Sequence, residues 1–223
     1  MDGLVDALKS FNRKERYYVV RNALVGRDGF ALEPEFGRRL SDVVGANMPV
    51  PPDAFVAIDY HLDWLYAALC VARGTAVDER ETENPLQDPR HPDAGRVVTG
   101  KQEDIDLLVA FDVDSSTHLI LVEAKGVTSW SRGKLRSKCS RLAGIFDADL
   151  VAERTVVPAV ILWSPRESTN LDPKHLDPKK PNEQTNLPSW IAGEKFRRLQ
   201  LDVPAGLRSV RRTNPSKFVV TRK

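Results

Sequence analysis

Three charged residues stand at the ends of two apolar runs in this chain. Asp106 lies in the run IDLLVAF, and Glu123 and Lys125 close the run LILVEAK. Side chains alternate along a strand, so Glu123 and Lys125 project from one face and Ala124 from the other. If residues 113–116 form a four-residue loop, the two runs pair as a hairpin in which Asp106 lies directly opposite Glu123. The spacing therefore predicts two carboxylates and one ammonium group at the same end of a sheet.

These charges stand among residues that are otherwise apolar. Both runs are largely aliphatic between their charged ends, which is typical of strands that are buried on both faces. An unpaired charge is costly to bury in such a place. A divalent cation held by oxygen ligands would compensate the carboxylates. The alternative is a structural ion pair of Lys125 with Glu123 or Asp106, which needs no ligand.

The spacing of apolar residues predicts the elements that must position this hairpin. Helices are predicted over residues 5–24, 33–44, 54–74 and 131–146. Strands are predicted over residues 103–111, 118–125 and 155–163. This order, helices first and then β-β-α-β, indicates one mixed α/β domain. We expect an N-terminal helical extension over residues 1–50 and a core over residues 51–223 that ends in a basic section.

The composition is that of an ordinary folded domain. Of 223 residues, 41% are hydrophobic and 29% are charged, which excludes a disordered chain, a collagen-like fibre and a coiled coil. No window reaches ~18 consecutive apolar residues, and the first residues lack the apolar stretch of a signal peptide. Cys70 and Cys139 are too few for a disulfide framework or a four-cysteine zinc site. The sequence predicts a cytoplasmic protein with no membrane partner.

The formal net charge of +2 conceals two opposed blocks. Residues 53–112 contain thirteen Asp or Glu and five Lys or Arg, whereas residues 195–223 contain nine Lys or Arg and one Asp. A basic block is typical of contact with nucleic acid or another anionic surface. The alternative is a solvated basic face without a partner.

The two apolar runs together resemble the core signature of the PD-(D/E)xK nuclease superfamily, which includes restriction-endonuclease-like and Holliday-junction-resolvase-like enzymes. The matching positions are Asp106 for the first acid and Glu123 and Lys125 for the E-x-K motif, while Ile105 stands where the signature has proline. The resemblance extends from the region 56–72 through the predicted helix at 131–146. It implies a restriction-endonuclease-like fold, in which a central mixed sheet is flanked by helices.

The resemblance also implies a cofactor and a substrate. Asp106, Glu123 and the backbone carbonyl of Ala124 would bind Mg²⁺, with Mn²⁺ as an alternative, and Lys125 would act on the attacking water and the phosphate. The products would carry a 5′-phosphate and a 3′-hydroxyl. The expected partner is nucleic acid, DNA rather than RNA, and a homodimer is left open.

Neighbouring helices would supply the rest of the site. Such enzymes often add an acid from a preceding helix, and either Asp59 or Asp63, four residues apart on the predicted helix 54–74, could fill that role. Trp130 would stack on a base or pack beneath a loop. The predicted helix 131–146 carries a basic stripe that would lie along phosphates or face solvent, formed by Lys134, Lys138 and Arg141.

Two functions from different classes fit these residues. The leading hypothesis is a Mg²⁺-dependent nuclease. The rival is a non-catalytic nucleic-acid-binding or assembly protein, which keeps the nuclease-like fold and holds the three charges as a salt-bridge cluster. Asp104 and Asp106 also form a D-x-D triplet, a pattern that is common by chance.

Overall fold

The structure is a computed structural model of the chain. It describes residues 3–12, 14–25, 30–45, 49–76, 83–84, 86, 97–126, 130–146, 155–165, 171–176, 187–203 and 208–222. The helices are α1 (Leu4–Phe11), α2 (Glu15–Val20), the π-helical turn η1 (Arg21–Val25), α3 (Pro34–Val44), α4 (Leu62–Ala72), α5 (Arg132–Ile145) and the short 3₁₀ turn η3 (Pro173–His175). The strands are β1 (Phe55–His61), β2 (Asp104–Val113), β3 (Ser116–Ala124), β4 (Val156–Ser164), β5 (Arg197–Gln200), β6 (Arg208–Asn214) and β7 (Lys217–Arg222).

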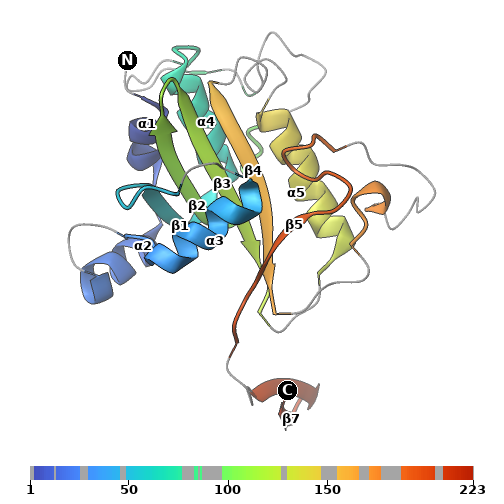
Figure 1. The fold of residues 1–223 in the computed structure, drawn as a ribbon. Helices are drawn as coiled ribbons and strands as arrows, with labels where there is room; N and C mark the ends of the chain where they lie inside the picture. Colours follow the sequence, from blue (N-terminus) through green and yellow to red (C-terminus); the bar gives the residue numbers. More distant parts are fainter. Residues whose placement is uncertain are drawn as a thin grey trace.

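Five of the strands form one mixed sheet in the order β1-β2-β3-β4-β5. The pairs β1–β2 and β2–β3 are antiparallel, whereas β3–β4 and β4–β5 are parallel. The parallel step from β3 to β4 needs a crossover, and α5 lies within it. The predicted class is therefore confirmed: the fold is mixed α/β, with a central mixed sheet flanked by helices (Figure 1).

Helices cover both faces of the central strands (Figure 1). One face packs against α1, α4 and α5, whose core side chains include Leu8 and Leu142. The other face packs against α3 through Leu40. Because side chains alternate, Leu121 of β3 joins the first core and its neighbour Val122 joins the second. The apolar runs are thus buried on both faces, as their composition predicts.

The β2–β3 hairpin has the predicted register but a tighter turn. Leu107 lies opposite Val122, which is the pairing expected from a hairpin centred on residues 113–116. Val113 and Ser116 themselves pair, so the turn contains two residues instead of four. Asp114 in this turn has a positive φ of 52°, a left-handed conformation that aspartate tolerates better than most residues. The shorter turn adds a pair to the ladder without shifting it.

The predicted helix over residues 54–74 is wrong in its first half. Residues Phe55–His61 form β1, and only Leu62–Ala72 are helical. The segment FVAI suits a strand because it combines an aromatic residue with two β-branched ones. Its backbone hydrogen bonds go to β2, a partner about fifty residues away that local periodicity does not reveal. Asp59 and Asp63 consequently belong to different elements and do not share one flank of a helix.

The predicted helix over residues 5–24 is also interrupted. α1 ends at Phe11, and Asn12 is extended, with φ −71° and ψ 101°. The Tyr18 hydroxyl group donates a hydrogen bond to the Asn12 carbonyl oxygen at 2.8 Å. Asparagine competes with the helix for backbone hydrogen bonds, so it is a suitable residue for such a break. The break allows α1 to pack against α4 while α2 takes a separate direction.

Other predicted elements agree with the structure. α3 begins at Pro34 and ends at Gly45, whose φ of 69° is the left-handed conformation that a helix stop favours. The helix predicted over 131–146 is α5, and the strand predicted over 155–163 is β4. Among the described helices, none has the length and apolar character needed to cross a membrane.

Candidate active site

The β2–β3 hairpin brings Asp106 and Glu123 next to each other. Leu107 opposite Val122 is the last regular pair, and Asp106 and Glu123 are the residues that follow it on the two strands. The backbone N–H of Ala124 donates a hydrogen bond to Asp106 Oδ2 at 2.6 Å, which ties the β2 carboxylate to β3. The two carboxylates are therefore neighbours across the hairpin, at the end of the sheet.

An irregularity in the sheet lies beside this pair. Neither Asp59 of β1 nor Asp106 of β2 belongs to the otherwise continuous pairing of these strands, and Asp59 has a positive φ of 50°. Strict alternation would send residues three apart to opposite faces, yet Ile105 and Leu108 both join the core beneath α4 and α5. The strand thus changes its facing at Asp106, and such interruptions commonly re-aim a side chain at the rim of a sheet.

Glu123 is the buried centre of the charge cluster. Its side chain is only 11% exposed. Lys138 of α5 donates a hydrogen bond to Glu123 Oε2, and the Lys125 Nζ lies 3.5 Å from Oε1. Burial raises the pKa of the Glu123 carboxyl, and the nearby Asp106 carboxylate adds to the rise, whereas Lys138 and Lys125 act in the opposite direction. The fold therefore disfavours the charged form of Glu123 even with two ammonium groups beside it.

Lys125 is positioned by its backbone and by an aromatic ring. Its backbone N–H donates to the Trp163 carbonyl of β4 at 2.8 Å. Its Nζ donates to the Ala124 carbonyl at 3.1 Å and lies 5.4 Å from the centre of the Trp130 ring. A cation over an aromatic face is attracted to the ring. Trp130 packs partly against the core, and its observed partner is the Lys125 ammonium group.

A polar cavity of about 650 Å³ opens beside these residues. Acidic and basic side chains from β3, α5 and the segment that leads into β2 dominate its lining. Its lining residues include Glu103, Asp104, Glu123, Lys125, Trp130, Lys134 and Lys138. Asp106 is not one of the lining residues.

Asp104 belongs to the site although the sequence analysis set it aside. Its Oδ2 accepts a hydrogen bond from Lys14 Nζ at 2.6 Å, and its backbone carbonyl accepts one from Lys138 Nζ at 2.6 Å. Its Oδ1 is buried and has no hydrogen-bond partner within the described part of the chain. The D-x-D triplet with Asp106 was the signal that could have identified it.

Each candidate for the additional acid pairs with an arginine. Asp59 Oδ2 lies 3.2 Å from Arg16 Nη2. Asp63, on α4, pairs with Arg141 and accepts hydrogen bonds from the backbone N–H groups of Thr99 at 3.1 Å and Gly100 at 3.0 Å. The structure therefore uses Asp63 as an anchor for α5 and for the chain that enters β2.

The predicted basic stripe on α5 is largely wrong. Of its three members, only Lys134 is exposed. Lys138 turns toward Glu123 and Asp104. Arg141 has a side chain that is 9% exposed and pairs with Asp63 and Glu103. The spacing correctly places the three residues on one side of the helix, but Lys138 faces the Glu123 carboxylate and Arg141 faces those of Asp63 and Glu103 instead of solvent.

The oxygen atoms at this site suit a hard divalent cation. Asp106, Glu123 and the Ala124 carbonyl supply carboxylate and carbonyl oxygens, the ligands that Mg²⁺ prefers. Asp104, whose buried Oδ1 has no hydrogen-bond partner among the described residues, lines the same cavity. Asp106 and the Ala124 carbonyl each already accept one hydrogen bond from the chain, and Glu123 accepts two. Within the described residues, no three His, Cys, Asp or Glu side chains form a metal-binding group by themselves. A cation here would thus depend on the backbone carbonyl and water as well.

The chain has no counterpart among the proteins compared with it. No family model, no curated protein and no solved structure matches it. The resemblance to the PD-(D/E)xK signature therefore rests on the residues of the β2–β3 hairpin alone.

Proposed function

We propose that this protein is a metal-dependent nuclease of the PD-(D/E)xK type that hydrolyses phosphodiester bonds in DNA. The single observation that supports it most is the convergence of Asp106, Glu123 and Lys125 beside one cavity, at the end of strands whose central residues are buried and apolar. Charges at such a position are costly. A catalytic function that requires these charges would explain why they stand at the end of apolar strands.

The fold supports the same proposal at a coarser level. A mixed sheet flanked by helices is what a restriction-endonuclease-like core would have. The two acids lie on an antiparallel hairpin, and α5, which follows it, contributes Lys134 and Lys138 to the cavity. The arrangement therefore provides acids for a cation and bases for phosphates on one surface.

Asp106, Glu123 and the Ala124 carbonyl would hold Mg²⁺ or Mn²⁺, with Asp104 as a further candidate ligand. When bound, such a cation lowers the pKa of a coordinated water molecule and neutralises charge on the phosphate oxygens. The Ala124 N–H would keep Asp106 oriented through its hydrogen bond to Oδ2.

The basic residues of the site would act on the phosphate. Lys125, held between the Ala124 carbonyl and the Trp130 ring, would stabilise negative charge that develops on the phosphate oxygens and orient the attacking water. Lys134 is exposed at the cavity and would contact the DNA backbone. Lys138 would balance the charge of Glu123 from within the protein.

One observation favours the second candidate, a non-catalytic protein that binds nucleic acid or assembles with a partner. Lys138 and Lys125 together already neutralise the Glu123 carboxylate. A salt-bridge cluster of this kind is self-sufficient and needs no cation. The two candidates differ in whether a divalent cation binds at the hairpin.

Cleavage assays test the leading proposal. The purified protein is incubated with duplex, single-stranded and branched DNA in Mg²⁺ or Mn²⁺, and product ends are mapped. We expect metal-dependent products with a 5′-phosphate and a 3′-hydroxyl group, and no products with Asp106→Asn. Lack of cleavage of every DNA form by the wild type in both metals would contradict the enzyme assignment.

Thermal denaturation distinguishes the nuclease from the non-catalytic protein and does not require an activity assay. Mg²⁺ or Mn²⁺ at concentrations well above the dissociation constant should raise the melting temperature of the wild type, since a ligand that binds only the folded state stabilises it. Asp106→Ala should lose this rise, whereas Asp42→Ala, which removes an exposed carboxylate on α3, should keep it. An unchanged melting temperature in the wild type would favour the self-sufficient salt-bridge cluster.

A further inference from the structure

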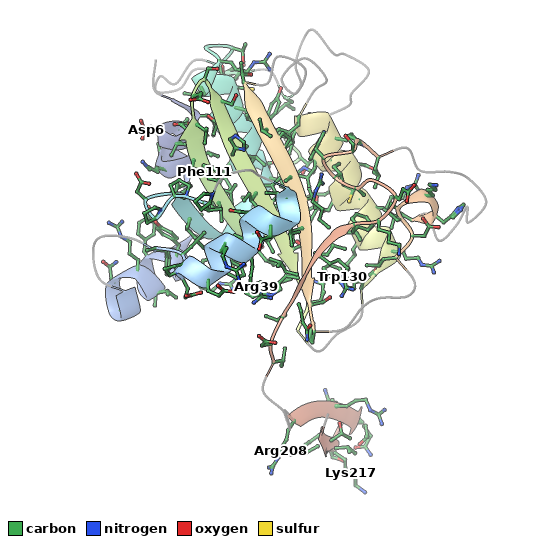
Figure 2. The ribbon with its side chains drawn as sticks, in the orientation of Figure 1. Asp6, Arg39, Phe111, Trp130, Arg208 and Lys217 are labelled. Carbon is green, nitrogen blue, oxygen red and sulfur yellow. The ribbon has the colours of Figure 1, made fainter. Side chains whose placement is uncertain are left out.

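The C-terminal hairpin is a separate basic element. β6 and β7 pair only with each other in a two-stranded sheet, which Figures 1 and 2 show apart from the five-stranded sheet, with Arg208 and Lys217 on it. Asn214 at its tip accepts a hydrogen bond from the backbone N–H of Ser216 at 3.0 Å, which closes the turn. From residue 203 to the last residue, the chain contains six Lys or Arg and no Asp or Glu.

The register of the hairpin determines what each of its faces presents. Val210 lies opposite Val220 and Arg212 opposite Phe218, so these four side chains share one face. Val210 is 69% exposed and Phe218 is 67% exposed. The other face carries Arg211, opposite Val219. Both faces thus combine an exposed cation with exposed apolar side chains.

The β6–β7 hairpin lacks a packing partner within the described part of the chain. An isolated two-stranded hairpin is only marginally stable in water, and this one exposes apolar residues instead of burying them. Arg212 braces the tip by donating to the carbonyl oxygens of Asn214 at 3.0 Å and Pro215 at 2.8 Å. The other described cations of the hairpin, Arg208, Arg211 and Lys217, are exposed. A partner that covers the hairpin must therefore accept cations on both faces.

Charge decides between the possible partners. A second copy of the hairpin would bring arginines against arginines with no acid between them, which is repulsive. A polyanion has the complementary charge. An anionic membrane would engage one face only, whereas the cations stand on both faces. A two-stranded ribbon fits the major groove of a DNA duplex, where phosphates flank it on both sides.

We propose that the β6–β7 hairpin is a duplex-DNA-binding ribbon, remote from the β2–β3 site, whose arginines and lysine contact the phosphates of a groove. The choice of DNA among polyanions rests on the proposed nuclease function. The hairpin would supply affinity for the substrate and the β2–β3 site its hydrolysis. The apolar strip of Val210, Phe218 and Val220 would then pack against sugars and bases in the groove.

The test measures binding in the absence of cleavage. The full-length protein is titrated onto a fluorescent DNA duplex in EDTA, and the affinity is followed against salt concentration. The triple variant Arg208→Gln, Arg211→Gln, Lys217→Gln is compared with a body control, Lys9→Gln, Arg38→Gln, Lys174→Gln, which removes the same charge from exposed positions outside the hairpin. Melting curves of both variants establish that each is folded.

We expect the hairpin variant to bind on the order of 10- to 100-fold more weakly at low salt, with a salt slope shallower by about 2 to 3, since each phosphate contact contributes about 0.9. The body control should bind like the wild type. Equal effects of the two variants would overturn the proposal, because general charge would then explain binding. Loss of binding to phosphatidylserine vesicles by the hairpin variant, with DNA binding unchanged, would also overturn it.

The two proposals can fail separately. Hairpin-dependent binding in EDTA together with no cleavage in Mg²⁺ would support the ribbon and contradict the nuclease. Cleavage by a hairpin variant whose affinity and salt slope match the wild type would contradict the ribbon and support the nuclease.

Discussion

Glu123 illustrates how much of the proposed chemistry depends on single residues. It is buried, it lies beside the Asp106 carboxylate, and it is approached by the ammonium groups of Lys125 and Lys138. The two lysines differ in their surroundings, since Lys125 faces the cavity and the Trp130 ring, while Lys138 is enclosed between Glu123 and the Asp104 carbonyl. We therefore assign the phosphate to Lys125 and the internal charge balance to Lys138.

The first prediction concerns Lys125. Lys125→Met should abolish DNA cleavage, a loss on the order of 10²- to 10³-fold or more, because no other group at that position stabilises the phosphate charge. DNA affinity in EDTA should stay close to that of the wild type. Lys134→Met is the matched control and should retain turnover while weakening binding. If Lys125→Met retained cleavage but lost DNA binding, Lys125 would serve DNA binding instead of catalysis, and the roles given to Lys125 and Lys134 would be exchanged.

The second prediction concerns pH. Because the Glu123 pKa is raised in the folded protein, the folded state binds more protons than the unfolded state above the ordinary value of 4.5. The contribution of Glu123 to stability is therefore fully present below pH 4.5 and is lost as pH rises through the raised pKa. Glu123→Gln removes this loss, so its melting temperature relative to the wild type should rise as pH increases from 4.5 to neutrality.

Glu35→Gln serves as the control with the opposite sign. A hydrogen bond from Arg38 lowers the pKa of the Glu35 carboxyl, so its contribution is present above 4.5 and lost as pH falls through the lowered pKa. Its variant should lose stability relative to the wild type as pH increases toward 4.5. The same pH trend in both variants would contradict the assignment of a raised pKa to Glu123.

At the scale of elements, the site depends on a clamp formed by Arg141. Its guanidinium group pairs with Asp63 of α4 and with Glu103, which precedes β2, and it donates to the Val97 carbonyl. One side chain on α5 thus joins three segments at the wall of the cavity. This clamp holds Glu103 in that wall.

The third prediction tests the clamp. Arg141→Ala should cost about 3–5 kcal/mol of unfolding free energy, because it removes the cationic partner of two carboxylates in a largely buried place. Arg38→Ala is the control, since Arg38 also pairs with two carboxylates, Glu35 and Asp42, but in an exposed position. It should cost about 0–1 kcal/mol. Chemical denaturation measures both values, and similar losses in the two variants would show that Arg141 is not a buried clamp.

At the scale of the molecule, the hydrophobic cores and the proposed DNA-binding hairpin lie in different parts of the chain. The five-stranded sheet and its helices contain both hydrophobic cores. None of the residues of β6 or β7 belongs to either core. The near-neutral total charge is the sum of an acidic body segment and this basic C-terminal section.

The fourth prediction follows from that division. Removal of residues 204–223 should change the melting temperature by less than about 2 °C, below the effect of 1 kcal/mol at this chain length, because no described core residue is lost. DNA binding in EDTA should fall as in the triple hairpin variant. A large drop in melting temperature would show that the hairpin stabilises the body.

Local sequence was sufficient for the elements whose conformation their own residues dictate. The hairpin register, and with it the positions of Asp106 and Glu123 just beyond the pair of Leu107 and Val122, followed from a turn centred on residues 113–116. The start of α3 at Pro34 and its end at Gly45 followed from the conformations that these two residues favour. Burial of both faces of β2 and β3 followed from their continuous apolar runs.

Only the tertiary structure decided which charges meet. The edge strand β1 exists because β2 lies beside it, and its apolar spacing fits a helix equally well. Lys138 and Arg141 face carboxylates from β3, α4 and the segment that precedes β2, all of which are remote from α5 in sequence. Helix periodicity could therefore predict that the two residues share one side of α5, but it could not predict which residues they contact. Ion pairs between distant segments depend on how elements pack, and packing is set by the whole core rather than by any local pattern.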